Sequence, residues 1–160
     1  MKVKNFILAE LIERGGLYRD VKGNTPREVL DSLIGALPLI PSIPAETLLN
    51  AVLEREALMS TSAGGGIALP HPRNPLAGSV SEQFVTLAFP EHPINWNSLD
   101  GKPVNTLMLI VSASAKHHLQ TLSEITFFCR EEAFCQLLRE RAPKEDLLNF
   151  IREAEKNWEN

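Results

Sequence analysis

The stretch Val104-Asn105-Thr106-Leu107-Met108-Leu109-Ile110-Val111 is rich in apolar and strand-forming residues, and it predicts a central strand of a buried sheet. A similar run, Phe84–Phe89, precedes it, and Asp100-Gly101 supplies a turn between the two. A third and shorter run, Ile67-Ala68-Leu69, stops at Pro70. The chain therefore contains at least three strands, and the last of them leads directly into a helix signal.

Helices are expected on both sides of these strands. The clearest start is Thr25-Pro26, where a capping threonine is followed by proline at the first helical position and by Glu28 three residues after the cap. Four other helices are predicted, over 6–12, from a cap at Ser42 to about Ala57, from a cap at Ser112 or Ser114 through Cys129, and from Pro143 onward. Strands interleaved with helices predict an α/β layered fold, and 160 residues suit a single domain over 1–160.

The composition excludes several classes of function. With 44% hydrophobic residues, 22% charged residues and a formal charge of -4, the chain resembles an average globular protein and has no basic footprint for nucleic acid. Its apolar stretches are too short to span a bilayer, and residues 1–5 do not begin an export signal, so we expect a cytoplasmic protein. Cys129 and Cys135, six residues apart, would lie on different faces of one helix, which favours reduced thiols over a redox pair.

His71 is the first candidate for chemistry, because it follows a strand and lies between two prolines. The end of a strand in an α/β fold is where side chains meet ligands, and Gly64-Gly65-Gly66 allows a close approach. A neutral imidazole offers one free nitrogen as a nucleophile while a hydrogen bond holds the other. Such an imidazole can accept a phosphoryl group directly, and the alternative that the local pattern leaves open is a histidine that is satisfied within a rigid turn.

Three further groups could assist an anion. Lys116-His117-His118-Leu119 begins a predicted helix, whose free N–H groups favour phosphate and keep a histidine neutral, so His118 can donate to phosphoryl oxygens. For His117 a solvent-facing position is preferred. Arg55 and Arg73 offer forked guanidinium donors, although each alone would be read as a surface arginine.

Several of these motifs occur together and in order: Arg55-Glu56 to Ser60-Thr61, then Gly66-Ile67-Ala68-Leu69-Pro70-His71, Asp100-Gly101-Lys102-Pro103-Val104, and His118-Leu119 with Leu122. In this the chain resembles enzyme IIA of the bacterial phosphoenolpyruvate-dependent sugar phosphotransferase system, in the fructose/mannitol class that includes the nitrogen-regulatory form. The resemblance runs from the Thr25 helix to the C-terminal helix. It implies a single domain with a mixed β-sheet flanked by helices and a shallow site where another protein docks.

The resemblance also implies roles for individual residues. His71 would be the phosphorylated residue, receiving phosphoryl from a phosphocarrier of the HPr type and passing it to an enzyme IIB domain or using it to regulate a target protein. His118 would bind phosphoryl oxygens and Arg55 would stabilise charge, with Arg73 and Thr61 at the rim and no cofactor, no metal and no membrane insertion. The chain departs from many nitrogen-regulatory members where it has Pro72-Arg73 in place of Gly-Lys, which concerns the choice of partner. With no fused IIB or membrane segment, the stand-alone regulatory form is favoured.

Two other functions stay open at this point. The fold could serve as an interaction module that binds a transporter, kinase or transcription factor without phosphorylation of His71. A metal site drawn from His71, His92, His117 and His118 is disfavoured, because no carboxylate or cysteine spacing completes a familiar zinc motif. Trp96 and the loop around Ile94 could belong to a docking rim or to buried packing.

Overall fold

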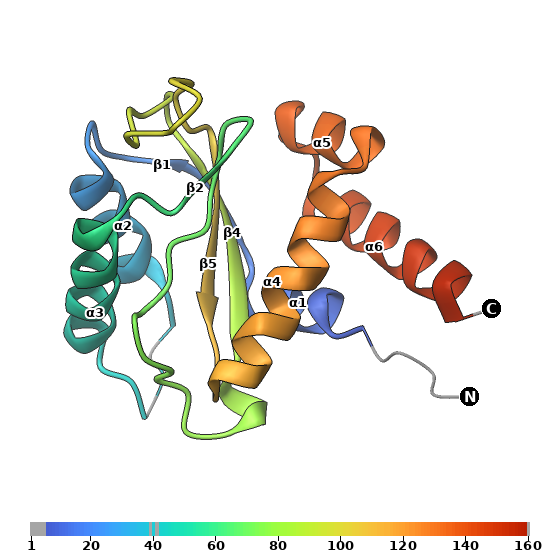
Figure 1. Cartoon of the computed structure of the whole chain (residues 1–160), viewed down its shortest axis with the longest axis horizontal. Coiled ribbons are helices and arrows are strands. Elements are labelled where there is room, and N and C mark those ends of the chain that lie inside the picture. Colours follow the sequence, from blue (N-terminus) through green and yellow to red (C-terminus); the bar gives the residue numbers. More distant parts are fainter. Residues whose placement is uncertain (1–5, 39, 41, 160) are drawn as a thin grey trace.

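The predicted strands form the middle of one mixed sheet in a computed structural model that describes residues 6–38, 40 and 42–159 (Figure 1). The order across the sheet is β1-β4-β5-β3-β2. The bounds are β1 Leu17–Val21, β2 Ser62–Gly64, β3 Ile67–Ala68, β4 Phe84–Pro90 and β5 Thr106–Val111. All residues of β4 and β5 are buried, which confirms that the run before Val111 is a central strand. β5 pairs antiparallel with β4 and parallel with β3.

Helices cover both faces of this sheet. α2 and α3 lie on one side, and α1, α4, α5 and α6 lie on the other (Figure 1). Their bounds are α1 Leu8–Gly15, α2 Pro26–Ala36, α3 Ala45–Leu58, α4 Ala115–Cys129, α5 Glu132–Arg139 and α6 Lys144–Glu159, and a short 3₁₀ helix spans Val80–Glu82. Each face of the sheet has its own apolar core. The α/β prediction with a mixed, helix-flanked sheet is therefore confirmed.

Two of the predicted helix caps form as expected. The Oγ1 of Thr25 accepts the N–H of Glu28 at 3.1 Å, and the carboxylate of Glu28 accepts the N–H of Asn24 at 2.9 Å. The Oγ of Ser114 accepts the N–H of His117 at 3.2 Å, so Ser114 rather than Ser112 caps α4. These local bonds satisfy N–H groups that a helix start leaves unpaired.

The predicted cap at Ser42 is wrong. α3 begins at Ala45 with Pro44 before it and without a side-chain cap, while the hydroxyl of Ser42 donates to the carboxylate of Glu82. The stretch 38–44 still separates α2 from α3, although Leu39 and Pro41 within it lie outside the described residues, as do residues 1–5. The hydroxyl of Ser42 therefore bonds to a side chain that is distant in the sequence and does not cap α3.

α1 occupies a different range from the one predicted, because a distant side chain sets its start. The carboxylate of Glu124, in α4, accepts the N–H groups of Ile7 at 2.9 Å and of Leu8 at 3.1 Å. The helix then continues to Gly15, where a Cβ atom would lie only 2.0 Å from the carbonyl oxygen of Val85. Glycine thus allows the end of α1 to lie directly against β4.

The sequence analysis did not predict β1, β2 or α5. α4 ends at Cys129 and α5 begins at Glu132, so Cys129 and Cys135 lie on successive helices and not on different faces of one helix. The thiol of Cys135 donates to the carbonyl oxygen of Cys129 at 3.0 Å. Burial, and then the nearby Cys135, raise the pKa of Cys129 to about 12, and both residues are free thiols. A thiol with so high a pKa is a poor nucleophile.

Two apolar side chains of the loop between β4 and β5 are buried. Ile94 and Trp96 are each 1% exposed, so buried packing is correct for both and a docking rim is not. The Asp100-Gly101 turn forms, with the N–H of Gly101 donating to the carbonyl of Ser98 at 3.0 Å. Across the described ranges, no helix is both long enough and apolar enough to cross a membrane.

Candidate functional site

The site lies where two parallel strands end at the same edge of the sheet. β3 and β5 pair in parallel through Ile67 with Thr106 and Ala68 with Leu107. The N–H of Ile110 donates to the carbonyl oxygen of Pro70 at 3.0 Å, which extends the contact past the end of β3. His71 therefore lies beside the end of β5, and carboxyl ends of parallel strands are the common place for ligand sites in α/β sheets.

A backbone carbonyl holds the ring of His71 in one tautomer. The Nδ1 of His71 lies 2.8 Å from the carbonyl oxygen of Leu69, which can only accept, so Nδ1 carries the proton and donates it. Burial lowers the pKa of His71, the bond to Leu69 opposes this, the charge of Arg55 lowers it further and that of Glu56 raises it. A neutral ring with its proton on Nδ1 leaves the lone pair of Nε2 as the nucleophile.

His118 lies against His71. Their ring centroids are 4.5 Å apart with the planes tilted by 41°, and His118 is in the first turn of α4. Burial, followed by the charges of His71 and Arg55, lowers the pKa of His118 to about 4. His118 is therefore neutral near pH 7, and a neutral imidazole carries one N–H that it can donate to an oxyanion.

Arg55 adds positive charge from the last turn of α3. Its Nη1 donates to the carbonyl oxygen of Met59 at 2.7 Å, and its charge lowers the pKa of both histidines. The structure thus brings the rings of His71 and His118 together, and it places Arg55 where its charge acts on both.

Thr61 lies behind the site rather than at its rim. It is 8% exposed, and the carboxylate of Glu56 accepts both its N–H at 2.7 Å and its hydroxyl at 2.6 Å. The carbonyl of Thr61 in turn accepts the N–H of Leu69 at 3.0 Å. Glu56, Thr61 and Leu69 therefore connect the end of α3 to the carbonyl that holds His71.

An open cavity of about 250 Å³ contains both histidines. Its lining residues are His71, Pro72, Arg73, Asn74, Pro75, Ile110, Ser112, Ala115, His118 and Leu119. Arg73 lines the cavity and is exposed, and none of the lining residues is a carboxylate. A larger hollow of about 390 Å³, between the β2–β3 hairpin and α4 and α5, includes neither histidine.

Sequence reasoning missed Ser112 as a residue of this cavity. The sequence offers Ser112 as a helix cap, yet its side chain is buried at the end of β5 and lines the cavity with His118. Its place directly after a central strand is the signal that could have identified it. Leu119 was seen only as a partner of the His-Leu motif, and the structure leaves it 65% exposed beside the cavity.

The other two histidines make contacts of their own. The Nδ1 of His117 lies 2.7 Å from the Oγ of Ser114, and the ring is half-buried, so the preferred solvent-facing position is wrong in part. The Nε2 of His92 lies 2.7 Å from the Oδ1 of Asn24. Among the residues that the structure describes, no group of three or more His, Cys, Asp or Glu side chains is placed to hold a metal ion.

Known proteins resemble this chain in sequence. The nitrogen regulatory protein of Escherichia coli (strain K12) is 32% identical over 123 residues, which cover 71% of this chain and 70% of the relative. The fructose-specific EIIABC component of Bacillus subtilis (strain 168) is 26% identical over 153 residues, covering 93% of this chain and 24% of that protein.

Solved structures share the fold. Nitrogen regulatory protein IIA-Ntr from Neisseria meningitidis matches with a TM-score of 0.78 at 20% identity, covering 91% of this chain and 99% of that one. IIA mannitol from Escherichia coli matches with a TM-score of 0.66 at 18% identity, covering 84% and 94%. The model of the family named phosphoenolpyruvate-dependent sugar phosphotransferase system, EIIA 2, matches residues 10–154. The chain therefore belongs to the EIIA 2 family of the phosphoenolpyruvate-dependent sugar phosphotransferase system.

Proposed function

We propose that the protein is a cytoplasmic phosphoryl carrier that accepts a phosphoryl group on the Nε2 of His71 and passes it on. The observation that carries the proposal is the hydrogen bond from the Nδ1 of His71 to the carbonyl of Leu69 at 2.8 Å, with the His118 ring at 4.5 Å in the same open cavity. This arrangement supplies a nucleophile of fixed tautomer and a second donor beside it.

The reaction follows from these contacts. The lone pair of Nε2 attacks the phosphorus of a donor phosphohistidine, the new N–P bond forms as the old one breaks, and the donor ring keeps the electron pair of the broken bond. In the product the Nδ1–H still donates to Leu69, which stabilises the positive charge that the ring acquires. No proton has to move at His71, and the transfer is reversible.

His118 and Arg55 would stabilise the transferred group. Phosphoryl transfer depends mostly on position and on charge at the equatorial oxygens. Because the pKa of His118 is near 4, the ring donates a hydrogen bond without adding a second cation or competing as a charged group. Arg55 is held by its hydrogen bond to the carbonyl of Met59, and its positive charge acts on both rings.

The donor in this proposal is a phosphocarrier protein of the HPr type, and the acceptor is a IIB domain or a regulatory target. A IIB acceptor is supported by the solved complex of enzyme IIAMTL with phosphorylated enzyme IIBMTL from Escherichia coli, whose IIA chain matches with a TM-score of 0.64 at 17% identity over 86% of this chain and 94% of that one. A regulatory role is supported by the likeness to nitrogen regulatory proteins. Of the two roles we favour the nitrogen-regulatory one. We also propose that residues 1–160 form a single domain.

The test is phosphorylation by phosphoenolpyruvate, enzyme I and an HPr-type carrier, followed by intact-mass analysis. We expect one phosphoryl group on the wild type and on His92→Ala, the control, whose ring contacts Asn24 away from the site. We expect none on His71→Ala. The bond should be labile in acid and stable in alkali, since a protonated imidazole is a good leaving group.

A protein-binding module that works without phosphate is the second candidate, and Leu119, 65% exposed beside the cavity, favours it. It requires that partner binding be the same for wild type and His71→Ala and that no donor labels either. Labelling of the wild type alone would reject it.

A further inference from the structure

The rim of the His71 cavity combines exposed apolar side chains with basic ones. Leu119 lines the cavity and is 65% exposed, and Met59, which is not a lining residue but whose carbonyl holds Arg55, is 66% exposed. Large apolar side chains gain little from a small anion in water, but they gain when another protein covers them. The rim is therefore built for contact with a protein surface.

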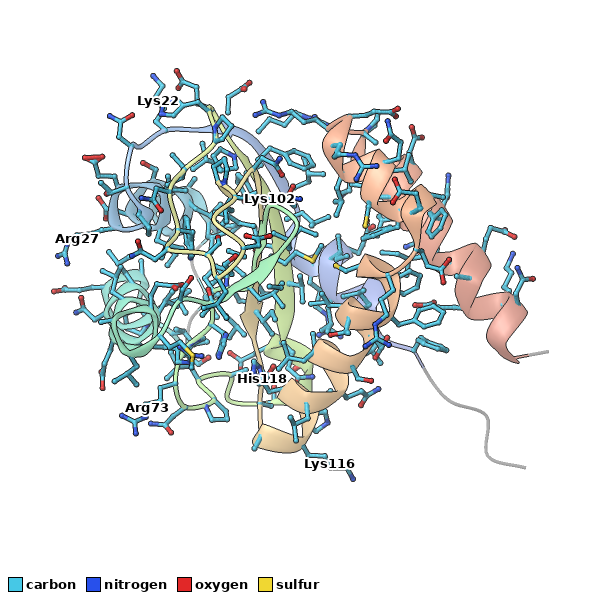
Figure 2. The ribbon with its side chains drawn as sticks, turned by 45° about the horizontal axis from the view of Figure 1, so that its top comes forward. Lys22, Arg27, Arg73, Lys102, Lys116 and His118 are labelled. Atoms are coloured by element: carbon cyan, nitrogen blue, oxygen red, sulfur yellow. The ribbon has the colours of Figure 1, made fainter. Side chains whose placement is uncertain are left out.

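Two exposed cations lie on the same side of the molecule as this cavity. Arg73 lines the cavity and Lys116 is in the first turn of α4, and both lie on the side of the molecule that carries His118 (Figure 2). Within the described ranges, neither takes part in an ion pair. The charge of Arg55, from the last turn of α3, also acts on both rings.

Negative charge is nearly absent from this rim. None of the residues that line the cavity is acidic, and the carboxylate that acts on His71, that of Glu56, is occupied by both hydrogen bonds from Thr61. The whole chain has the opposite sign, with 20 acidic and 16 basic residues. The rim is therefore locally basic on an acidic protein, and such a contrast steers partners of opposite charge to one place.

We propose that the phosphoryl donor docks through an apolar patch ringed by Asp and Glu side chains, which face Arg73 and Lys116 while the patch covers Leu119. This inference rests on the proposed function and names the chemistry of the partner surface. Complementary charge at an exposed rim acts mainly on the rate of association.

The same rim favours release of the donor after transfer. A phosphoryl group on His71 adds a net charge of roughly -1 on the side of Arg73 and Lys116, because its oxygens carry about -2 while the ring becomes positive. The added charge offsets the basic rim, so the phosphorylated protein attracts an acidic donor less than the free protein does. The transfer step itself thereby weakens the contact that preceded it.

The test uses one phosphorylated HPr-type carrier in two versions, with Glu or with Lys at three exposed positions around its phosphohistidine. The second-order rate of transfer to the wild-type protein is measured at low and high salt. We expect the Glu version to transfer about tenfold faster or more at low salt, with the advantage falling toward one at high salt. Equal rates, or faster transfer from the Lys version, would overturn the inference.

Charge-reversal variants of this chain test which of its residues cause the preference between the two carriers. Arg73→Glu with Lys116→Glu should reverse the preference between the two carriers. The control, Lys22→Glu with Arg27→Glu, makes the same change in net charge at residues away from His118 (Figure 2) and should keep the wild-type preference. Because the ratio of two rates is compared within each variant, a general change in reactivity cancels. If the control variant lost its preference for the Glu carrier as fully as the Arg73 and Lys116 variant, net charge would explain the preference. That result would reject a local role for Arg73 and Lys116.

Phosphoramidate, a small phosphoryl donor, separates this inference from the proposed function. Label on His71 from phosphoramidate but from neither carrier would reject the acidic donor surface and leave His71 as an acceptor. No label from phosphoramidate or from either carrier would reject the proposed function and this inference together.

Discussion

Replacing Glu124 should destabilise the protein more than any other change to a single carboxylate described above. Glu124 is 1% exposed in α4, the helix that carries His118. One of its oxygens, Oε1, accepts both the N–H of Ile7 and the N–H of Leu8 and so starts α1 without a local cap. We compare Glu124→Ala, which removes the acceptor, with Glu124→Gln, which keeps an oxygen but not the charge.

The two hydrogen bonds, at 2.9 and 3.1 Å, set the expected magnitude. Leaving a donor unsatisfied on burial costs about 1–3 kcal/mol, so the alanine variant should lose roughly 3–5 kcal/mol. The glutamine variant loses the charge at a helix N-terminus, about 1–2 kcal/mol in a buried setting. For a chain of this length about 1 kcal/mol corresponds to roughly 3 °C in Tm, which separates the variants clearly.

Urea unfolding followed by far-UV circular dichroism, at pH 7 and equal protein concentration, measures both losses. Ser123→Ala, an exposed neighbour in the same helix, is the control and should change little. A loss below about 1 kcal/mol for Glu124→Ala would refute the assignment of the cap. Equal losses for alanine and glutamine would show that the charge, and not the accepted bonds, holds α1.

Three further predictions follow from other contacts. Because folding lowers the pKa of His118 from 6.5 to about 4, the unfolded chain binds more protons between these values, so the free energy of unfolding should rise with pH there, and His118→Gln should reduce this slope in urea titrations. Gly15→Ala should lose about 2 kcal/mol or more against the Val85 carbonyl, whereas Gly35→Ala, in open helix, should gain about 0.5–1 kcal/mol by the same measurement. Arg55→Ala should slow phosphoryl transfer about 100-fold or more and Arg55→Lys less, and unchanged rates would remove Arg55 from the reaction.

The parts of the fold that local chemistry determines were predictable from the sequence. The capping box at Thr25 and the buried β5 run needed no knowledge of the rest of the chain. β1 escaped prediction because it is a short edge strand with exposed Arg19 and Asp20, so it lacks an apolar pattern. α5 was missed because the break after Cys129 has neither proline nor glycine to mark it.

The candidate site likewise has features that the sequence predicts and features that only the folded structure determines. His71 and His118 were candidates from residue type and order, the role of Arg55 was implied only by the family resemblance, and the fold places the two rings together with the charge of Arg55 acting on both. The carbonyl of Leu69 that holds His71, and the support of Thr61 by Glu56, could not be predicted. Both depend on backbone directions that form only when β3 is in place, and a sequence pattern does not contain them.

The central claim is that the Nε2 of His71 carries the phosphoryl group, and ¹⁵N–³¹P correlation spectroscopy of the phosphorylated protein tests it most directly. With ¹⁵N-labelled histidine, coupling to phosphorus should appear at one nitrogen, the Nε2 of His71, and be absent from His71→Ala. Coupling at Nδ1 would contradict the tautomer that the bond to Leu69 requires, and coupling at His118 would contradict the assignment of the acceptor.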